Sequence, residues 1–545
     1  MMRFLLALAL LLNSIPALAQ HRHPARAQKK PVALMAGLGT HHHAVSTSNA
    51  QAQKFFDQGF TFIYAFNHEM AVRSFERAAQ LDPQMAMAYW GVAYALGPNI
   101  NMDVDPERER AAYAAAQKAL ALSKNAPENE RAYIEALVKR YSNDPKADLK
   151  RLAVDFKNAM GELSRRFPDD LDAATLYAES GMNLRPWQLW TKDGQPAEGT
   201  EEIVSTLESV LRRDPNHIGA IHYYIHAVEA SPNPERALAY VAKLPAQTPA
   251  AGHLVHMPAH IYMRTGDYAN AALSNDLAAK ADRAFFRLNG NEGMYPVMYY
   301  NHNVHFLAIA YSMEGRFSDA IRAARELESN VSPHLKALPM LEGFMTTSTL
   351  MLVRFHRWDD ILRLRKPAPN MVASNTLWHF ARGMAFAAKG QTAQAVRELK
   401  LFIGARKGVP ADANFGLNSA QNILQIAEDF LEGKIALAQK DYTAAVEHFE
   451  NGVKIQDALA YDEPPAWFIP MREPFGGALM LQGKYSEAEK VFRADLEKNP
   501  HSGRSLFGLS ESLKAQGKEE EAQTARKEFE AAWKNADTPL KIKDL

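Results

Sequence analysis

The sequence predicts an all-α fold, a right-handed superhelical α-solenoid of about a dozen helix-turn-helix repeats. Two observations lead to this prediction. Small residues, aromatic residues and alanines recur at fixed positions of a 34-residue period. The chain of 545 residues is also longer than one globular core normally supports. A solenoid escapes that limit because each repeat packs only on its neighbours.

Three consecutive repeats show the period most clearly. A repeat that begins at Ile218 has Ala237 at position 20 and Pro249 at position 32. The next two begin at Gly252 and Asn301, and their positions 8, 15, 17 and 20 hold Ala259, Gly266, Tyr268 and Ala271, then Ala308, Gly315, Phe317 and Ala320. In this pattern the chain resembles the tetratricopeptide repeat (TPR) family. Segments such as HHHAVSTS and GHLVHMPAHIYMR also resemble a group of large exported bacterial TPR proteins with a histidine-rich groove and unassigned activity.

The N-terminal residues predict export. Residues 1–19 have the pattern of a cleaved signal peptide, with a basic residue, an apolar run too short to span a bilayer and the small-residue cleavage pattern Ala17-Leu18-Ala19. We therefore expect a periplasmic or extracellular protein whose mature chain has no membrane span. Residues 20–51 are expected to form an extended arm that contains histidines.

Three blocks of repeats are expected after the arm. Residues 52–217 form N-terminal TPR-like repeats with an inserted loop at residues 184–198, which we place over the mouth of the groove because a loop without its own core must pack on something. Residues 218–341 form the histidine-rich repeats, in which Phe286–Tyr300 is a candidate lid. Residues 342–545 form C-terminal TPR repeats and a capping helix.

Histidines concentrate on one face of the middle repeats. Positions 2, 5 and 9 of a first helix lie three and four residues apart, so their side chains form one stripe along the concave face. In the three repeats these positions hold Gly219, His222 and His226, then His253, His256 and His260, then His302, His305 and Ile309. Random placement of the 19 histidines would give about 0.3 at nine positions, whereas seven are found. The sequence therefore predicts a metal site.

The amino-acid composition limits which metal centre is possible. The chain has no cysteine, which excludes c-type haem, iron–sulfur clusters, blue copper and thiolate zinc. Imidazole suits copper, zinc, iron and nickel. Copper is favoured over zinc or iron by the histidine-rich stripe, the expected export and two nearby methionines, and two groups of three histidines resemble the ligand spacing of coupled dicopper proteins. Seven candidate ligands exceed what one tetrahedral ion needs, which favours a dinuclear site or one ion with further histidines that support its ligands.

Several further residues are candidates. Glu179 and Glu229 face the expected groove and are possible acid or base groups. His41, His42 and His43 in the arm and His68 in a turn are additional candidate ligands, although histidines in arms and turns are commonly only solvated.

Two classes of function are compatible with these observations. The first is an exported metalloenzyme, an oxidoreductase in preference to a hydrolase, that acts on an unknown small molecule or peptide. The second is a non-catalytic module that binds a peptide or partner protein in the groove or sequesters metal, which is the usual role of repeat scaffolds. A groove of neutral, hydrogen-bonded histidines without metal is the structural alternative. Lys and Arg equal Asp and Glu at 62 each, so we expect no nucleic-acid partner.

Overall fold

The computed structural model describes residues 32–545, so the expected signal peptide at residues 1–19 lies outside the described residues. From the arm onward the chain is built of helix pairs, as predicted. The N-terminal block contains α1 (Ala50–Tyr64), α2 (His68–Leu81), α3 (Ala86–Leu96), α4 (Pro106–Leu122), α5 (Glu128–Val138), α6 (Leu149–Arg166), α7 (Leu171–Met182) and α8 (Thr200–Arg213).

The histidine-rich block is less regular than its neighbours. It contains α9 (Ile218–Val228), α10 (Leu238–Val241), α11 (Lys243–Gln247), α12 (Gly252–His256), α13 (Pro258–Thr265), α14 (Tyr268–Asn289), α15 (Asn301–Met313) and α16 (Phe317–Val331). Pro258 divides the first helix of the second repeat into α12 and α13, because proline lacks the N–H that an uninterrupted helix requires. A short π-helix, Pro296–Tyr300, leads into α15.

The C-terminal block returns to regular pairs. It contains α17 (Thr347–Arg354), α18 (Trp358–Arg363), α19 (Val372–Ala388), α20 (Thr392–Arg406), α21 (Ala420–Ala438), α22 (Tyr442–Asp457), α23 (Arg472–Leu481), α24 (Tyr485–Lys498), α25 (Gly503–Ala515) and α26 (Glu519–Ala532). The strands β1 (Asn414–Phe415) and β2 (Asn418–Ser419) pair before α21. Short 3-10 helices lie at Ser123–Asn125, Pro234–Ala237, Ser332–His334, Pro339–Thr346 and Ile542–Asp544.

One contact explains why the helices of a repeat pack so closely. A glycine at position 8 of the first helix faces a phenylalanine at position 24 on the second helix. A Cβ atom at Gly59 would lie 2.8 Å from the Phe75 ring, and the same contact recurs between Gly433 and Phe449 and between Gly476 and Phe492. Only glycine allows this approach. The recurrence confirms the predicted repeat register in three separate parts of the chain.

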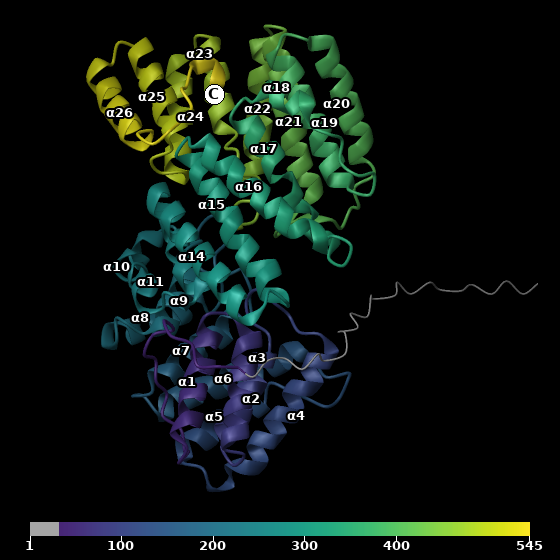
Figure 1. Ribbon diagram of the computed structural model, residues 1–545. Coiled ribbons are helices and arrows are strands. Elements are labelled where there is room, and N and C mark those ends of the chain that lie inside the picture. Colours follow the sequence, from purple (N-terminus) through teal and green to yellow (C-terminus); the bar gives the residue numbers. More distant parts are fainter. Residues whose placement is uncertain (1–31) are drawn as a thin grey trace, which may run out of the picture.

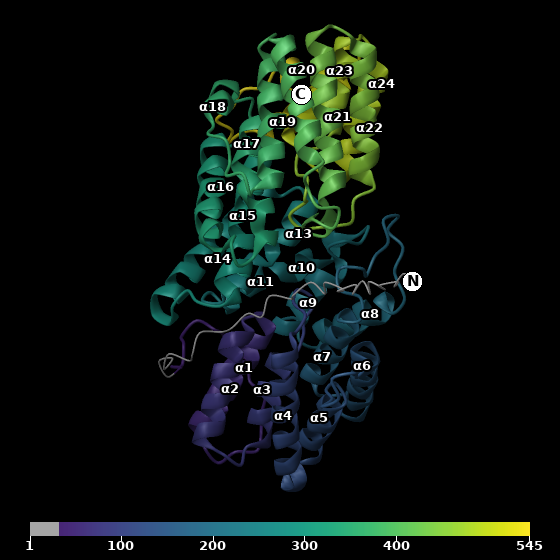
Figure 2. The ribbon, with the colours of Figure 1, turned by 90° about the vertical axis from the view of Figure 1, so that its right-hand side faces the viewer.

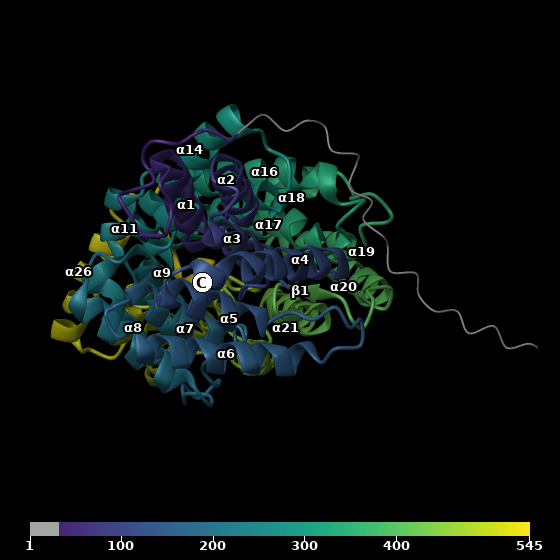
Figure 3. The same ribbon diagram turned by 90° about the horizontal axis from the view of Figure 1, so that it is seen from below.

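The helix pairs stack in chain order. Figure 1 shows α1–α7 at one end, α17–α26 at the other and the histidine-rich block between them, and Figure 2 shows the same order after a quarter turn. Seen from below in Figure 3, the helices α1 to α8 follow a curved path. Among residues 32–545, no helix is both long and apolar enough to cross a membrane.

The C-terminal helices pack back onto the middle of the chain. The Tyr268 hydroxyl donates a hydrogen bond to the Pro500 carbonyl at 2.9 Å, and the Asp537 amide donates one to the Gly315 carbonyl at 3.2 Å. Figure 1 shows the yellow C-terminal helices beside α15–α17. The C-terminal repeats therefore contact the histidine-rich block, which lies between them and the N-terminal block.

Candidate metal centre

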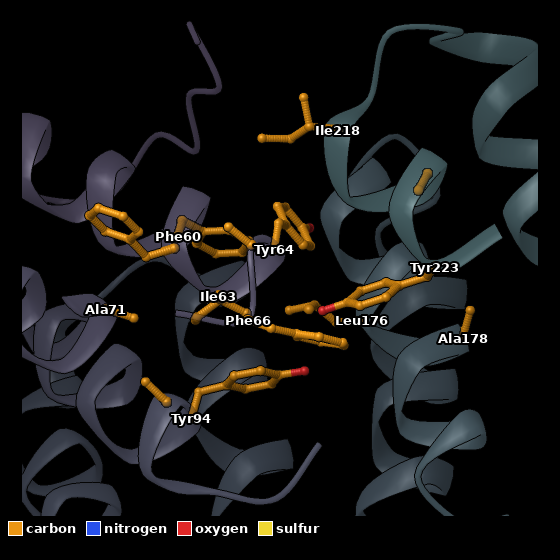
Figure 4. Packing of buried hydrophobic residues seen from close by; sticks show 14 of the residues in the cluster. Phe60, Ile63, Tyr64, Phe66, Ala71, Tyr94, Leu176, Ala178, Ile218 and Tyr223 are labelled. Atoms are coloured by element: carbon orange, nitrogen blue, oxygen red, sulfur yellow. The ribbon is translucent and has the colours of Figure 1, made fainter. Parts of the chain in front are cut away.

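Helix α9 brings its two histidines against the first repeat. A Cβ atom at Gly219 would lie 2.3 Å from the Tyr64 ring, so glycine lets α9 approach the end of α1. His222 Nδ1 lies 2.6 Å from the Tyr64 carbonyl oxygen. His226 Nδ1 lies 2.7 Å from Glu229 Oε1. Figure 4 shows Tyr64, Phe66 and Tyr223 packed between these elements.

The second repeat supplies three histidines around the Pro258 break. His256 Nδ1 lies 2.7 Å from Asn275 Oδ1, and the Asn275 Nδ2 group donates to the Ala271 carbonyl, which fixes the orientation of the amide. His260 Nδ1 lies 2.6 Å from Glu229 Oε2. The third repeat adds His302 from α15.

The histidines gather into two groups of three, which we call the first trio (His222, His226 and His253) and the second trio (His256, His260 and His302). Within each trio the ligand nitrogens lie within 4.8 Å of one another. The Nε2 atoms of His222 and His253 are 3.1 Å apart, and the Nε2 atom of His256 is 2.8 Å from that of His260 and 3.1 Å from that of His302. The rings of His226 and His260 approach to 5.3 Å between centroids, so the trios are neighbours.

The hydrogen bonds determine which ring nitrogen is free. A carbonyl or carboxylate oxygen can only accept, so the Nδ1 atoms of His222, His226, His256 and His260 carry hydrogen. When these rings are neutral, each Nε2 atom then has a free lone pair. At 2.8 Å the lone pairs of His256 and His260 face each other, and only a proton on one ring or a metal ion between them removes the repulsion. This is the pattern of metal-binding histidines, whose other nitrogen donates to a fixed acceptor.

Both trios are dry. The five histidines of α9, α12 and α13 are between 0% and 6% exposed. The Phe66 ring lies against the first trio, with centroids 4.5 Å from His222 and 5.3 Å from His253, and Phe66 has a φ of 52°, a left-handed conformation that costs about 1–2 kcal/mol. The Phe306 ring lies 4.9 Å from His260 in the second trio. The expected open stripe on a concave face is thus a closed site.

Burial keeps most of the rings neutral. Loss of solvent, with repulsion from neighbouring rings, holds the pKa of His222, His253, His256 and His302 well below the ordinary value. Burial also lowers the pKa of His226, despite Glu229. His260 differs, because Glu229 outweighs its burial and raises its pKa. Neutral imidazole is the form that binds metal.

Glu229 connects the trios. One carboxylate oxygen accepts from His226 and the other from His260, and His260 with His226 hold the pKa of Glu229 below its usual range although burial opposes this. The Tyr461 hydroxyl lies 3.2 Å from Glu229 Oε2 and 2.6 Å from Glu463 Oε1. A carboxylate contributed by the first histidine repeat therefore orients one ring in each trio.

Three candidate residues lie outside the trios. His305 lies against the Phe344 ring, and burial lowers its pKa to about 3. His68 is buried beside Asn99, and burial likewise lowers its pKa to about 3. Glu179 accepts from the Tyr94 hydroxyl at 2.7 Å and from Asn183 at 2.6 Å, and burial raises its pKa. None of these side chains reaches the trio nitrogens.

The arm histidines meet a different carboxylate. Asp172 accepts from the Tyr64 hydroxyl at 2.6 Å, His43 Nδ1 at 2.8 Å and His217 Nε2 at 3.2 Å, and His41 Nε2 lies 3.3 Å away. His42 is exposed and pairs with Asp57. The arm therefore fixes Tyr64, whose carbonyl holds His222, rather than adding a ligand to a trio.

The insertion after α7 lies where it was expected, at the mouth of the site. Trp187 and Trp190 line a narrow, partly open pocket with room for about one water-sized group, and His226 and Glu229 lie in its wall. The second insertion is not a lid. Tyr295 and Tyr299 are buried, and Tyr299 packs edge-on against His253 with ring centroids 5.0 Å apart. Phe286–Tyr300 therefore forms part of the wall behind the first trio.

Several residues of the site carry no recognisable signal in the sequence. Tyr64 acts through its backbone carbonyl, which any residue possesses. Asn275 lies on a second helix, where an amide is usually solvated. Tyr461 and Glu463 come from a loop far along the chain. Periodicity could identify only the histidine stripe and Glu229, the acidic residue that follows the stripe by one turn.

Comparison with known proteins finds only distant structural likenesses. No protein-family model matches the chain, and no curated protein matches its sequence. Similar solved structures include the human IFIT1 dimer with m7Gppp-AAAA (13% identity, 89% of this chain and 90% of that chain, TM-score 0.31), yeast Tom70 (11%, 87% and 96%, 0.31) and the Cut9–Hcn1 hetero-tetramer of the APC/C (12%, 89% and 74%, 0.30). Such a likeness carries no argument about function. The chain's own helix pairs and glycine–phenylalanine contacts define an all-α solenoid of TPR type that encloses two histidine trios.

Proposed function

We propose that this protein binds two transition-metal ions, copper in preference to zinc or iron, one at each histidine trio. The observation that carries the proposal is the convergence of Nε2 lone pairs, with four of the opposite nitrogens tied to fixed acceptors. Nitrogen ligands of a tetrahedral ion lie about 3.3 Å apart when the bonds are about 2.05 Å long. The Nε2 distances of 2.8–3.1 Å are close to that separation.

We further propose that the site is reactive and serves an exported, metal-dependent oxidation. A bound copper pair would supply the electron-transfer chemistry of such a reaction. The residues of this chain hold the rings in one tautomer through Glu229 and Asn275, exclude water with Phe66 and Phe306, and leave an approach beside His226. The methionines Met257 and Met263 pack in hydrophobic clusters and give copper no added support.

The alternative of a peptide groove has less support. The stripe that would contact a peptide is buried by other parts of the same chain. A partner protein on an outer face of the solenoid is compatible with the structure. The absence of a nucleic-acid partner stays a prediction.

The decisive experiment compares two histidines of one helix. His302→Ala removes a member of the second trio, whereas His305→Ala removes a stripe histidine that lies outside it. We expect elemental analysis of the purified mature chain to give two metal ions, about one after His302→Ala and two after His305→Ala. Equal metal content in both variants, or no metal after reconstitution with Cu²⁺, Zn²⁺ and Fe²⁺, would refute the proposal.

A further inference from the structure

The two trios differ in how their rings are held. In the second trio, His256 donates from Nδ1 to Asn275, and His260 donates from Nδ1 to Glu229. The third member, His302, is partly exposed, so water can accept the hydrogen of its Nδ1 atom. Every ring of the second trio therefore has an acceptor for its Nδ1 hydrogen when its Nε2 atom binds metal.

His253 is the exception in the first trio. His222 and His226 donate from Nδ1 to Tyr64 and Glu229, whereas the Nδ1 atom of His253 is buried and has no hydrogen-bond partner. His253 is only 1% exposed, so water from the surface does not reach this atom. The first trio therefore contains one ring that no acceptor orients.

The His253 ring is fixed and cannot turn to find an acceptor. The Phe66 ring stacks on it, with centroids 5.3 Å apart and an interplanar angle of 25°, and Tyr299 stands edge-on to it at 5.0 Å. The His253 backbone amide donates to the Tyr295 hydroxyl at 3.1 Å, and that hydroxyl donates to Asp282 at 2.9 Å. Packing and the backbone thus set both the position and the direction of this ring.

The hydrogen of the neutral His253 ring has a different place with and without metal. Without metal it lies on Nε2 and is donated to the lone pair of His222 Nε2, 3.1 Å away. When His253 binds metal through Nε2, the hydrogen must lie on Nδ1, where no acceptor is present. The first trio thus exchanges a hydrogen bond for a buried N–H group without a partner, which weakens its binding of metal.

We infer that the two metal sites differ in affinity, so that the second trio binds its ion more tightly and the ion of the first trio exchanges. This inference rests on the proposed function, because it concerns the ions that the trios would bind. Absence of the acceptor behind a metal-binding histidine typically weakens binding by about 10–100-fold, which sets the expected difference. A reaction that needs both ions would then run only when metal is plentiful, so the supply of metal would regulate the centre.

The test is a competition titration of the chain, loaded with Cu²⁺, against a chelator of known affinity. We expect two classes of ion in equal number, with dissociation constants that differ by about 10–100-fold. His222→Ala should remove the weaker class and leave the stronger one, and His302→Ala should do the reverse. Two ions of equal affinity in the wild type, or loss of the stronger class in His222→Ala, would overturn the inference.

Asn275 offers a variant that leaves all six histidines in place. Asn275→Leu removes the acceptor of His256 with little change in side-chain size, so the stronger class should weaken by about 10–100-fold and approach the weaker one. Asn270→Leu is the matched control on the same helix, because Asn270 is exposed and pairs with Asp267, and both affinities should stay as in the wild type. A stronger class that Asn275→Leu leaves unchanged would overturn its assignment to the second trio.

The same titration separates this inference from the proposed function. A chain that binds no ion refutes both. Two ions of equal affinity support the metal centre and refute the difference between the trios.

Discussion

Glu229→Gln is the most informative single change, because it keeps the size of the side chain and removes one acceptor. The carboxylate accepts from His226 Nδ1 with one oxygen and from His260 Nδ1 with the other. An amide has one oxygen and one donor nitrogen. The Nδ1 atom of one of the two rings must then face an N–H group. That ring takes the other tautomer, with its hydrogen on Nε2, and Nε2 then has no lone pair with which to bind metal.

Only one ring is affected, whichever way the amide turns. The one hydroxyl hydrogen of Tyr461 is directed at Glu463 Oε1, 2.6 Å away, rather than at Glu229 Oε2, 3.2 Å away, so Tyr461 accommodates either amide group. One trio should lose a ligand, His226 or His260, while the other trio stays intact. Removal of a group that orients a metal-binding histidine typically weakens metal binding 10–100-fold, about 1.4–2.7 kcal/mol.

The measurement is a competition titration of both metal sites against a chelator of known affinity. Wild-type chain should bind two ions, and Glu229→Gln should retain one tight site and show one site weakened 10–100-fold. Glu179→Gln is the matched control, a buried carboxylate that accepts from Tyr94 and Asn183 away from the trios, and it should bind both ions as the wild type does. Unchanged affinity at both sites, or equal weakening at both, would refute the tautomer reasoning.

Two further predictions concern buried carboxylates outside the trios. Asp172→Asn removes the charged acceptor of Tyr64, His43 and His217, so the unfolding free energy measured in urea should fall by about 1.5–3 kcal/mol. Thermolysin should also cut residues 32–49 faster in the variant. An unchanged rate of cleavage in the arm would contradict the role given to Asp172. Burial raises the pKa of Asp282 to about 7, so its contribution to stability is full below the unfolded pKa of about 3.9 and is lost as pH rises towards 7. Asp282→Asn should therefore flatten the pH dependence of the unfolding free energy between pH 4 and 7 by up to about 1.4 kcal/mol per pH unit, and an identical slope in the variant would contradict this assignment.

The fold class and the repeat register could be predicted from the sequence because both depend on local spacing. The glycine of position 8 and the phenylalanine of position 24 lie within one repeat, as Gly433 and Phe449 do, so their contact follows from periodicity. The histidine stripe likewise follows from residue spacing within each repeat. Six of its seven histidines fall in the two trios, and the seventh, His305, lies one turn too far along α15.

The surroundings of the trios could not be predicted, because they depend on how distant repeats meet. Periodicity indicates a concave face but does not show that distant segments cover it. Phe66 reaches His253 from the end of α1, and Tyr461 reaches Glu229 from the loop before α23. The composition of the arm predicts candidate ligands, whereas its contact with Asp172 depends on the packing of α7 beside it. Contacts between distant segments leave no periodic trace in a single sequence.

The contacts between distant repeats also set the order in which this site can form. An ordinary repeat array is modular, and a fragment of it can fold by itself. Here the site depends on a carbonyl 158 residues before His222 and on a hydroxyl 232 residues after Glu229. During synthesis the histidines emerge long before Tyr461 does. The proposed metal uptake therefore requires the chain as far as Tyr461, and removal of the first repeat or of the loop before α23 should disturb the centre rather than shorten it.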